Sequence, residues 1–151
     1  MRTISKDGFV FRFDNSYDEK AEPFGFVKVW QISEYTLDPN REILEHVQFC
    51  HEITYVISGK ATFLSGDAKD DLQQGDIHLI SKGVSHKIIP QERSNLRFAN
   101  IGFEFTEDLP EALVPLRELF ETNPHLVMRD NGTAPREIYY DGGKLIRSFF
   151  Y

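Results

Sequence analysis

Cysteine is almost absent from this sequence, because Cys50 is the only one in 151 residues. A single cysteine excludes an internal disulfide, which fits a reducing compartment such as the cytoplasm. Positive charge is also scarce, since 17 Lys and Arg stand against 24 Asp and Glu and give a formal net charge of -7. Because an acidic surface repels phosphate groups, we do not expect this chain to bind nucleic acid by itself.

Long apolar runs are missing as well. No stretch reaches the roughly 18 apolar residues that a membrane-spanning helix needs. Charges interrupt the N-terminal segment MRTISKDGFVFRF, unlike a secretory signal peptide. We therefore expect a cytoplasmic protein without a membrane partner. Hydrophobic residues make up 40% and aromatic residues 13% of the chain, which is enough for the core of a folded domain.

Short alternating segments separated by turn residues predict strands. They cover residues 9–13, 24–37, 61–64, 77–80, 86–89 and 96–105. The acidic run 67–71 fits a solvated hairpin tip. Several short strands with turns about every ten residues are typical of a β-sandwich or barrel. We therefore predict a mainly β domain over residues 1–106.

The pattern changes to helical spacing after residue 106. Apolar residues recur three and four apart over 109–120, which predicts an amphipathic helix. Asp108 is the predicted N-cap, Pro110 suits the first turn, and Pro124 ends the helix. We interpret 107–151 as a helical pair for dimerisation and linkage.

The second helix of that pair is predicted from about Thr133. It reaches Tyr151 still apolar, as LIRSFFY, without a Gly or Pro stop. We therefore expect the natural protein to continue beyond Tyr151.

A first motif, which itself supplies strands, comprises His46, Gln48, Glu52 and Gly59, with the spacing H-x-Q-x-x-x-E followed by six residues and G. With a period of two, one face of this stretch is polar; it carries His46, Gln48, Cys50, Glu52, Thr54 and Val56. The opposite face is more apolar; it carries Val47, Phe49, His51, Ile53, Tyr55 and Ile57. We expect the polar face to line the inside of a barrel and another element to cover the outside.

A second motif follows at Gly75, Gly83 and His86. The two motifs together resemble those of cupins, which read H-x-H, three or four residues, E, six residues, G, and then G, five residues, P-x-G, two residues, H, three residues, N. This resemblance implies a cupin-like jelly-roll barrel. Three positions depart from it, because Gln48 replaces the second histidine, Ser81 the proline and Pro90 the asparagine.

The motif residues His46, Gln48, Glu52 and His86 allow two interpretations. Two imidazoles, an amide oxygen and a carboxylate form a possible shell for iron, manganese or nickel. An amide is a poorer ligand than imidazole, however, so we favour a pocket whose polar groups bind a small molecule. We accordingly predict no metal and no cofactor.

Other candidate residues have both functional and structural interpretations. Trp30 offers a flat face for a sugar ring, although aromatic residues mostly build cores. His78, in an apolar strand, fits a satisfied core or pocket histidine. Both are included among the ligand-binding candidates. We expect His51 at the surface or between strands, His125 in solvent, and Cys50 as a small buried hydrophobe rather than a nucleophile.

The phrases HEITYVISGKATF, GDIHLISKGVSHKI and LRFANIGFEF, within residues 29–105, resemble the N-terminal sensor domain of AraC-type transcription regulators. That resemblance implies a small-molecule effector such as a sugar, a homodimer formed through two helices, and DNA binding through a helix-turn-helix domain absent from this chain. It also implies that the domain is not an enzyme. The alternatives are a metal-dependent cupin enzyme (a dioxygenase, isomerase or decarboxylase) and a stand-alone binding module.

Overall fold

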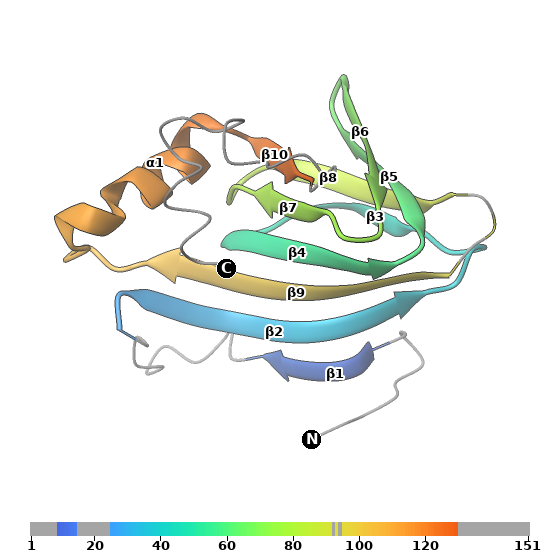
Figure 1. Cartoon of the computed structure of the whole chain (residues 1–151), viewed down its shortest axis with the longest axis horizontal. Helices are drawn as coiled ribbons and strands as arrows, with labels where there is room; N and C mark the ends of the chain where they lie inside the picture. The colour runs from blue at the N-terminus through green and yellow to red at the C-terminus, as the bar shows by residue number, and fades with distance from the viewer. Residues whose placement is uncertain (1–8, 15–24, 92, 94, 130–151) are drawn as a thin grey trace.

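Strands dominate the described part of the chain, which comprises residues 9–14, 25–91, 93 and 95–129 of this computed structural model (Figure 1). The strands are β1 (Phe9–Asp14), β2 (Val27–Leu37), β3 (Ile43–Val47), β4 (His51–Ser58), β5 (Lys60–Ser65), β6 (Ala68–Gln73), β7 (Ile77–Ile80), β8 (Ser85–Pro90), β9 (Leu96–Phe105) and β10 (His125–Met128). A short 3-10 helix, η1 (Glu111–Leu113), and one α-helix, α1 (Val114–Thr122), separate β9 from β10. No helix in these residues is long and apolar enough to cross a membrane.

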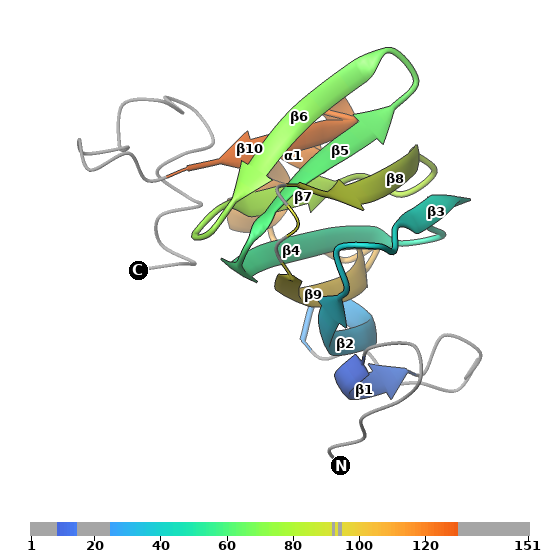
Figure 2. The same ribbon diagram turned by 90° about the vertical axis from the view of Figure 1, so that its right-hand side faces the viewer.

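The strands form two antiparallel sheets. The larger has the order β1-β2-β9-β4-β7-β10 and the smaller the order β3-β8-β5-β6. The chain passes between the sheets repeatedly, and Figure 2 shows β5, β6 and β8 above β4 and β9. This arrangement confirms the predicted mainly β jelly roll.

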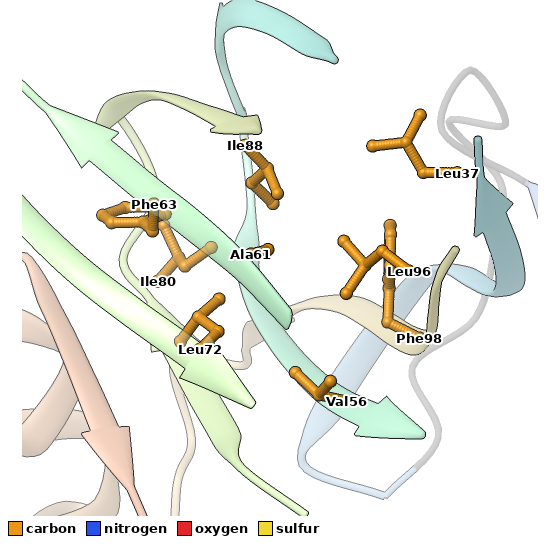
Figure 3. Close-up of a cluster of buried hydrophobic side chains, with 9 residues drawn as sticks. All are labelled: Leu37, Val56, Ala61, Phe63, Leu72, Ile80, Ile88, Leu96 and Phe98. Carbon is orange, nitrogen blue, oxygen red and sulfur yellow. The ribbon is translucent and has the colours of Figure 1, made fainter. Parts of the chain in front are cut away.

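An apolar core lies between the sheets and draws on both (Figure 3). Its buried members are Leu37, Val56, Ala61, Phe63, Leu72, Ile80, Ile88, Leu96 and Phe98. Each large apolar side chain buried in this way contributes about 1.5–3 kcal/mol. On β4 the inward residues Glu52, Thr54 and Val56 are buried, so the predicted alternation is confirmed along that strand. The single face predicted from His46 to Val56 is not one strand, because the chain leaves β3 after Val47 and enters β4 of the other sheet at His51.

Gly59 of the first motif is required by the close approach of two chain segments. Its φ is +89°, a left-handed conformation, and a Cβ added there would lie 2.3 Å from the backbone oxygen of Asn95. Any other residue would push the β4–β5 turn away from the start of β9.

Helix α1 covers part of the outer face of the larger sheet. Phe120 is buried with Leu79, Phe103 and Met128, and Leu116 packs against this cluster. The expectation that another element covers the outside of the sheet therefore holds around His51 and Ile53, whereas Val47, Phe49 and Tyr55 are exposed. The apolar stripe of α1 is used against its own sheet.

The predicted start of the helix is wrong. Pro110 is extended, with φ -59° and ψ 146°, and α1 begins at Val114 with Leu113 as N-cap and no side-chain cap. Asp108 therefore caps nothing there. Pro115 lies in the first turn, where its missing N–H costs no hydrogen bond. At the other end, Asn123 is extended, as expected before a proline, so the predicted stop at Pro124 holds.

Two strands were not predicted. Of the acidic run 67–71 only Asp67 lies at the hairpin tip, because β6 begins at Ala68 and pairs with β5. Within the segment predicted to be helical, β10 pairs antiparallel with β7 and extends the larger sheet. The second predicted helix, from Thr133, lies outside the described residues.

Candidate functional site

The two sequence motifs meet where β3 pairs with β8. His46 lies directly opposite His86 in this ladder. Their ring centroids are 4.4 Å apart. The fold therefore brings together two of the predicted site residues from separate motifs.

Each of these histidines is held by a backbone carbonyl. Nδ1 of His46 lies 2.8 Å from the oxygen of Leu44, and Nδ1 of His86 lies 2.9 Å from the oxygen of Val84. A carbonyl can only accept, so each neutral ring carries its proton on Nδ1 and keeps Nε2 as an acceptor. In each ring Nε2 is thus the atom that can accept a further hydrogen bond.

Glu52 supplies the carboxyl group beside them. Its side chain is buried, and its Oε2 lies 3.9 Å from His86 Nε2. Gln31 Nε2 donates to Oε1 at 3.3 Å. Burial raises the pKa of Glu52 to about 7, opposed by a hydrogen bond from Asn100, and burial is also the main cause that lowers the pKa of His86. Near neutrality Glu52 can therefore either donate or accept a hydrogen bond.

Gln31 reaches Glu52 across a glycine. A Cβ at Gly102 would lie 2.7 Å from Gln31 Cγ and 3.0 Å from Cys50 Sγ, so only glycine leaves room for this side chain. Gln31 could not be found from the sequence, because the register of β2 against β9 shifts between Val29 and Gln31 and a bulge interrupts the alternation. We call His46, Glu52 and His86, with the amides of Gln31 and Asn100, the motif group.

Gln48 connects the two motifs through its backbone. It lies between β3 and β4, and its carbonyl accepts from the N–H of Gly83 at 2.8 Å. Among the described residues, the ligand atoms of His46, Glu52 and His86 do not all lie close enough to one another to form a candidate metal cluster. The prediction that the motif group binds no metal stays a prediction.

Trp30 lies among partners outside the motif group. Its Nε1 donates to Glu104 Oε2 at 3.2 Å, and Lys28 Nζ lies 4.2 Å from the ring centre. The ring of Phe49 meets it edge-on at 5.5 Å. Lys28 thus lies over the Trp30 ring, and the sugar-stacking role of Trp30 stays a prediction.

His78 projects from β7 into the barrel, where it is 0% exposed. Its ring meets Phe63 edge-on at 4.3 Å. Burial lowers the pKa of His78 to about 3, so the ring is neutral. Neither ring nitrogen has a hydrogen-bond partner among the described residues. His78 is a core histidine as predicted, but the prediction that it is satisfied is wrong.

A family model for the AraC-like ligand binding domain matches residues 38–113. The chain belongs to this family. No curated protein matches it significantly.

Two solved structures share the fold of this AraC-like domain. YhaK from Escherichia coli is 10% identical with a TM-score of 0.57, over 80% of this chain and 51% of YhaK. The plu4264 protein from Photorhabdus luminescens is 16% identical with a TM-score of 0.50, over 69% of this chain and 81% of that protein. The match thus spans about half the length of YhaK, and at these identities the similarity shows the fold alone.

Two other histidines of the AraC-like domain lie where the sequence did not predict them. His51 is buried beneath α1, with its ring 4.8 Å from that of Phe120, and its Nδ1 accepts from the N–H of Lys82 at 3.1 Å. His125 is not solvated, because its Nδ1 lies 2.7 Å from Asp70 Oδ2. Neither position could be seen without knowing how α1 and β10 pack.

Ser81, where the cupin motif has proline, attaches the segment that follows α1. Its N–H donates to the oxygen of Pro124 at 3.0 Å. Its hydroxyl lies 2.6 Å from the oxygen of Asn123 and also contacts that of Phe120, so one proton serves two carbonyls. A proline could make none of these bonds. The departure from the motif therefore has a structural purpose.

Arg129 attaches the far end of β10. Its Nε and Nη2 donate to the two oxygens of Asp76 at 2.8 and 2.7 Å, and Nη2 also donates to the oxygen of Asp71 at 2.9 Å. The carboxylate of Asp76 accepts in addition from the N–H of Gln73. Both ends of β10 are thus fastened to residues that flank β7.

A cavity of about 370 Å³ lies on the opposite side of the larger sheet, beneath η1 and α1. All its lining residues are apolar, among them Ile53, Ile101 and Leu113. Ile53 neighbours Glu52 but points to the other face of β4. The polar motif group and this apolar cavity are therefore separate features.

Proposed function

We propose that the AraC-like domain senses a small polar metabolite, such as a sugar, through the motif group. The observation that carries this is the buried Glu52–His86 pair with His46 beside it. Convergent polar groups in an apolar barrel are the usual core of a small-molecule site. His46 is only half-buried, and β3 forms the edge of the smaller sheet, so this edge is the route of entry.

The register of the strands supports a path for the signal. Glu52 on β4 lies opposite Ile80 on β7, and Ile80 lies opposite His125 on β10. Ser81, next to Ile80, bonds the end of α1 and the residues after it. A ligand bound at Glu52 that prefers one arrangement of β4, β7 and β10 would therefore shift the equilibrium between alternative positions of α1 and β10.

We further propose that the domain acts as a homodimer in a regulator whose helix-turn-helix domain lies outside this chain. Family membership supports this role, and the net charge of -7 argues against DNA binding by these residues themselves. Leu116 and Leu119 pack against the sheet, so charge there would disturb the fold as well. Sedimentation of the unaltered chain over a concentration series is therefore the test, and a monomer throughout would contradict a dimer.

The ligand proposal is tested by thermal shift of the purified chain against monosaccharides, sugar acids and small carboxylic acids, followed by calorimetry on any hit. Glu52→Gln should weaken binding about 10- to 100-fold, the usual effect of losing a hydrogen bond to a charged group. Glu45→Gln on the exposed part of β3 is the matched control and should bind normally. If the affinity does not change on altering His46, Glu52 or His86, the ligand occupies another pocket. Turnover of a hit by a metal-loaded chain would favour the enzyme alternative.

A further inference from the structure

Three side chains that can ligate a metal converge outside the motif group, where β10 forms one edge of the larger sheet. Asp70 comes from β6, His78 from β7 and His125 from β10. His125 lies opposite Ile80, two residues from His78, so both imidazoles project from the same face of the sheet. Asp70 reaches them from the smaller sheet, next to β10 in Figure 2. We call these residues the closure group.

The geometry of the closure group is compact. One ligand atom from each residue can be chosen so that all three lie within 4.8 Å of one another. His125 Nδ1 is 2.7 Å from Asp70 Oδ2, at ion-pair distance but out of line for a hydrogen bond. Phe63 packs against both imidazoles, with ring centroids 4.3 Å from His78 and 5.1 Å from His125. The rings are thus held in position by an apolar wall.

His78 is the observation that points to a ligand. A buried polar group without a partner costs about 1–3 kcal/mol, so proteins seldom keep one without a use. Both nitrogens of His78 are unpartnered in the described part of the chain, and the residue is fully buried. Asp70 and His125, by contrast, are only partly buried, so the group remains open to an ion from solvent.

We propose that Asp70, His78 and His125 bind a divalent transition-metal ion, Zn²⁺ foremost. Two imidazoles and one carboxylate are a ligand set that Zn²⁺ takes in proteins, at about 2.0–2.2 Å from each atom, with a fourth position left for water. The three ligand atoms lie within 4.8 Å of one another, so the side chains would have to draw closer together around the ion. The ion would replace the direct His125–Asp70 contact and give His78 its missing partner. It would also join β6 of one sheet to β7 and β10 of the other.

The test uses tag-free protein treated with a chelator and then titrated with Zn²⁺ by calorimetry, with Co²⁺ absorption as a second readout. We expect one equivalent, and a rise in Tm on adding Zn²⁺ because the ion binds only the folded chain. Asp70→Asn and His125→Gln should each lower the affinity more than tenfold. Asp67→Asn, which removes a carboxylate from the tip of the same hairpin, is the matched control and should leave it unchanged.

His78→Gln alters a buried position that the fold itself can require, so the decision rests on the two partly exposed residues. Thermal unfolding without metal verifies that Asp70→Asn and His125→Gln are folded. The proposal is overturned if the wild-type chain binds no Zn²⁺. It is also overturned if binding survives both substitutions, and loss of binding in Glu52→Gln instead would place the ion in the motif group.

Discussion

The barrel contains two polar groups of similar composition, two histidines and one carboxylate each, that differ in how their atoms are satisfied. In the motif group each imidazole is held by a backbone carbonyl, and amides reach Glu52. In the closure group His78 has no hydrogen-bond partner among the described residues. A satisfied group beside a half-exposed edge suits a ligand that enters and leaves. An unsatisfied group that spans two sheets suits a resident ion.

The largest loss of stability is expected at Ser81, which bonds the segment between α1 and β10. Ser81→Pro restores the residue of the cupin motif but removes the N–H bond to Pro124 and the hydroxyl contacts to Asn123 and Phe120. Each buried carbonyl left unpaired costs about 1–3 kcal/mol, so we expect a loss of about 3–5 kcal/mol in the free energy of unfolding. Urea unfolding measures it. Ser81→Ala keeps the N–H bond to Pro124 and loses only the hydroxyl contacts, so it should cost less than Ser81→Pro; equal stability of Ser81→Pro and wild type would refute the attachment.

Glu52 gives the motif group a pH signature. Because its folded pKa is raised from 4.5 to about 7, the folded state binds more protons than the unfolded state between these values. Its contribution to stability is therefore full below about pH 4.5 and is lost as pH rises through 7, by about 3 kcal/mol in total. Glu52→Gln cannot titrate, so it should be the more stable protein at pH 8.

The measurement is the difference in unfolding free energy between wild type and Glu52→Gln at several pH values, since the difference removes the contributions of other groups. It should be small at pH 4.5 and grow with pH. A difference that stays constant between pH 4.5 and 8 would mean that Glu52 titrates normally and is not buried as described.

A smaller loss of stability is expected at Arg129, which fastens the end of β10. Arg129 is 41% exposed and pairs with Asp76, which is 0% exposed, whereas Arg97 is 45% exposed and pairs with Glu34, which is 23% exposed. Removing the partner of a buried carboxylate costs more than removing that of an exposed one. We expect Arg129→Ala to lose about 2 kcal/mol and Arg97→Ala at most about 0.5 kcal/mol. Hydrogen exchange should show faster exchange in β10 for Arg129→Ala alone; equal effects of both variants would contradict this.

The motif group could largely be found from the sequence, and the closure group could not. The spacing of His46, Glu52 and His86 indicated the fold through its resemblance to the cupin motifs, whereas the pairing of β3 with β8 was not predicted. The alternation along β4 gave its buried face correctly. Gln31 was missed because it follows a bulge, which breaks the period of two.

The closure group depends on contacts that no local pattern encodes. Strand β10 has only four residues, too few for periodicity to separate it from a loop. The prediction that His125 lies in solvent was therefore wrong, because its approach to Asp70 follows only from how β10 joins the sheet. From the sequence, Ser81 is only a departure from the motif. Its bonds to carbonyls about 40 residues away could not be predicted from the local pattern.

The most direct test of the two-group account is an imidazole carbon–proton NMR spectrum of the chain, which has five histidines. One sample is titrated with Zn²⁺ and another with a polar metabolite that raises Tm. We expect Zn²⁺ to shift the signals of His78 and His125, and the metabolite to shift those of His46 and His86. Zn²⁺ shifts confined to His46 and His86, or metabolite shifts that leave both of these unmoved, would contradict it.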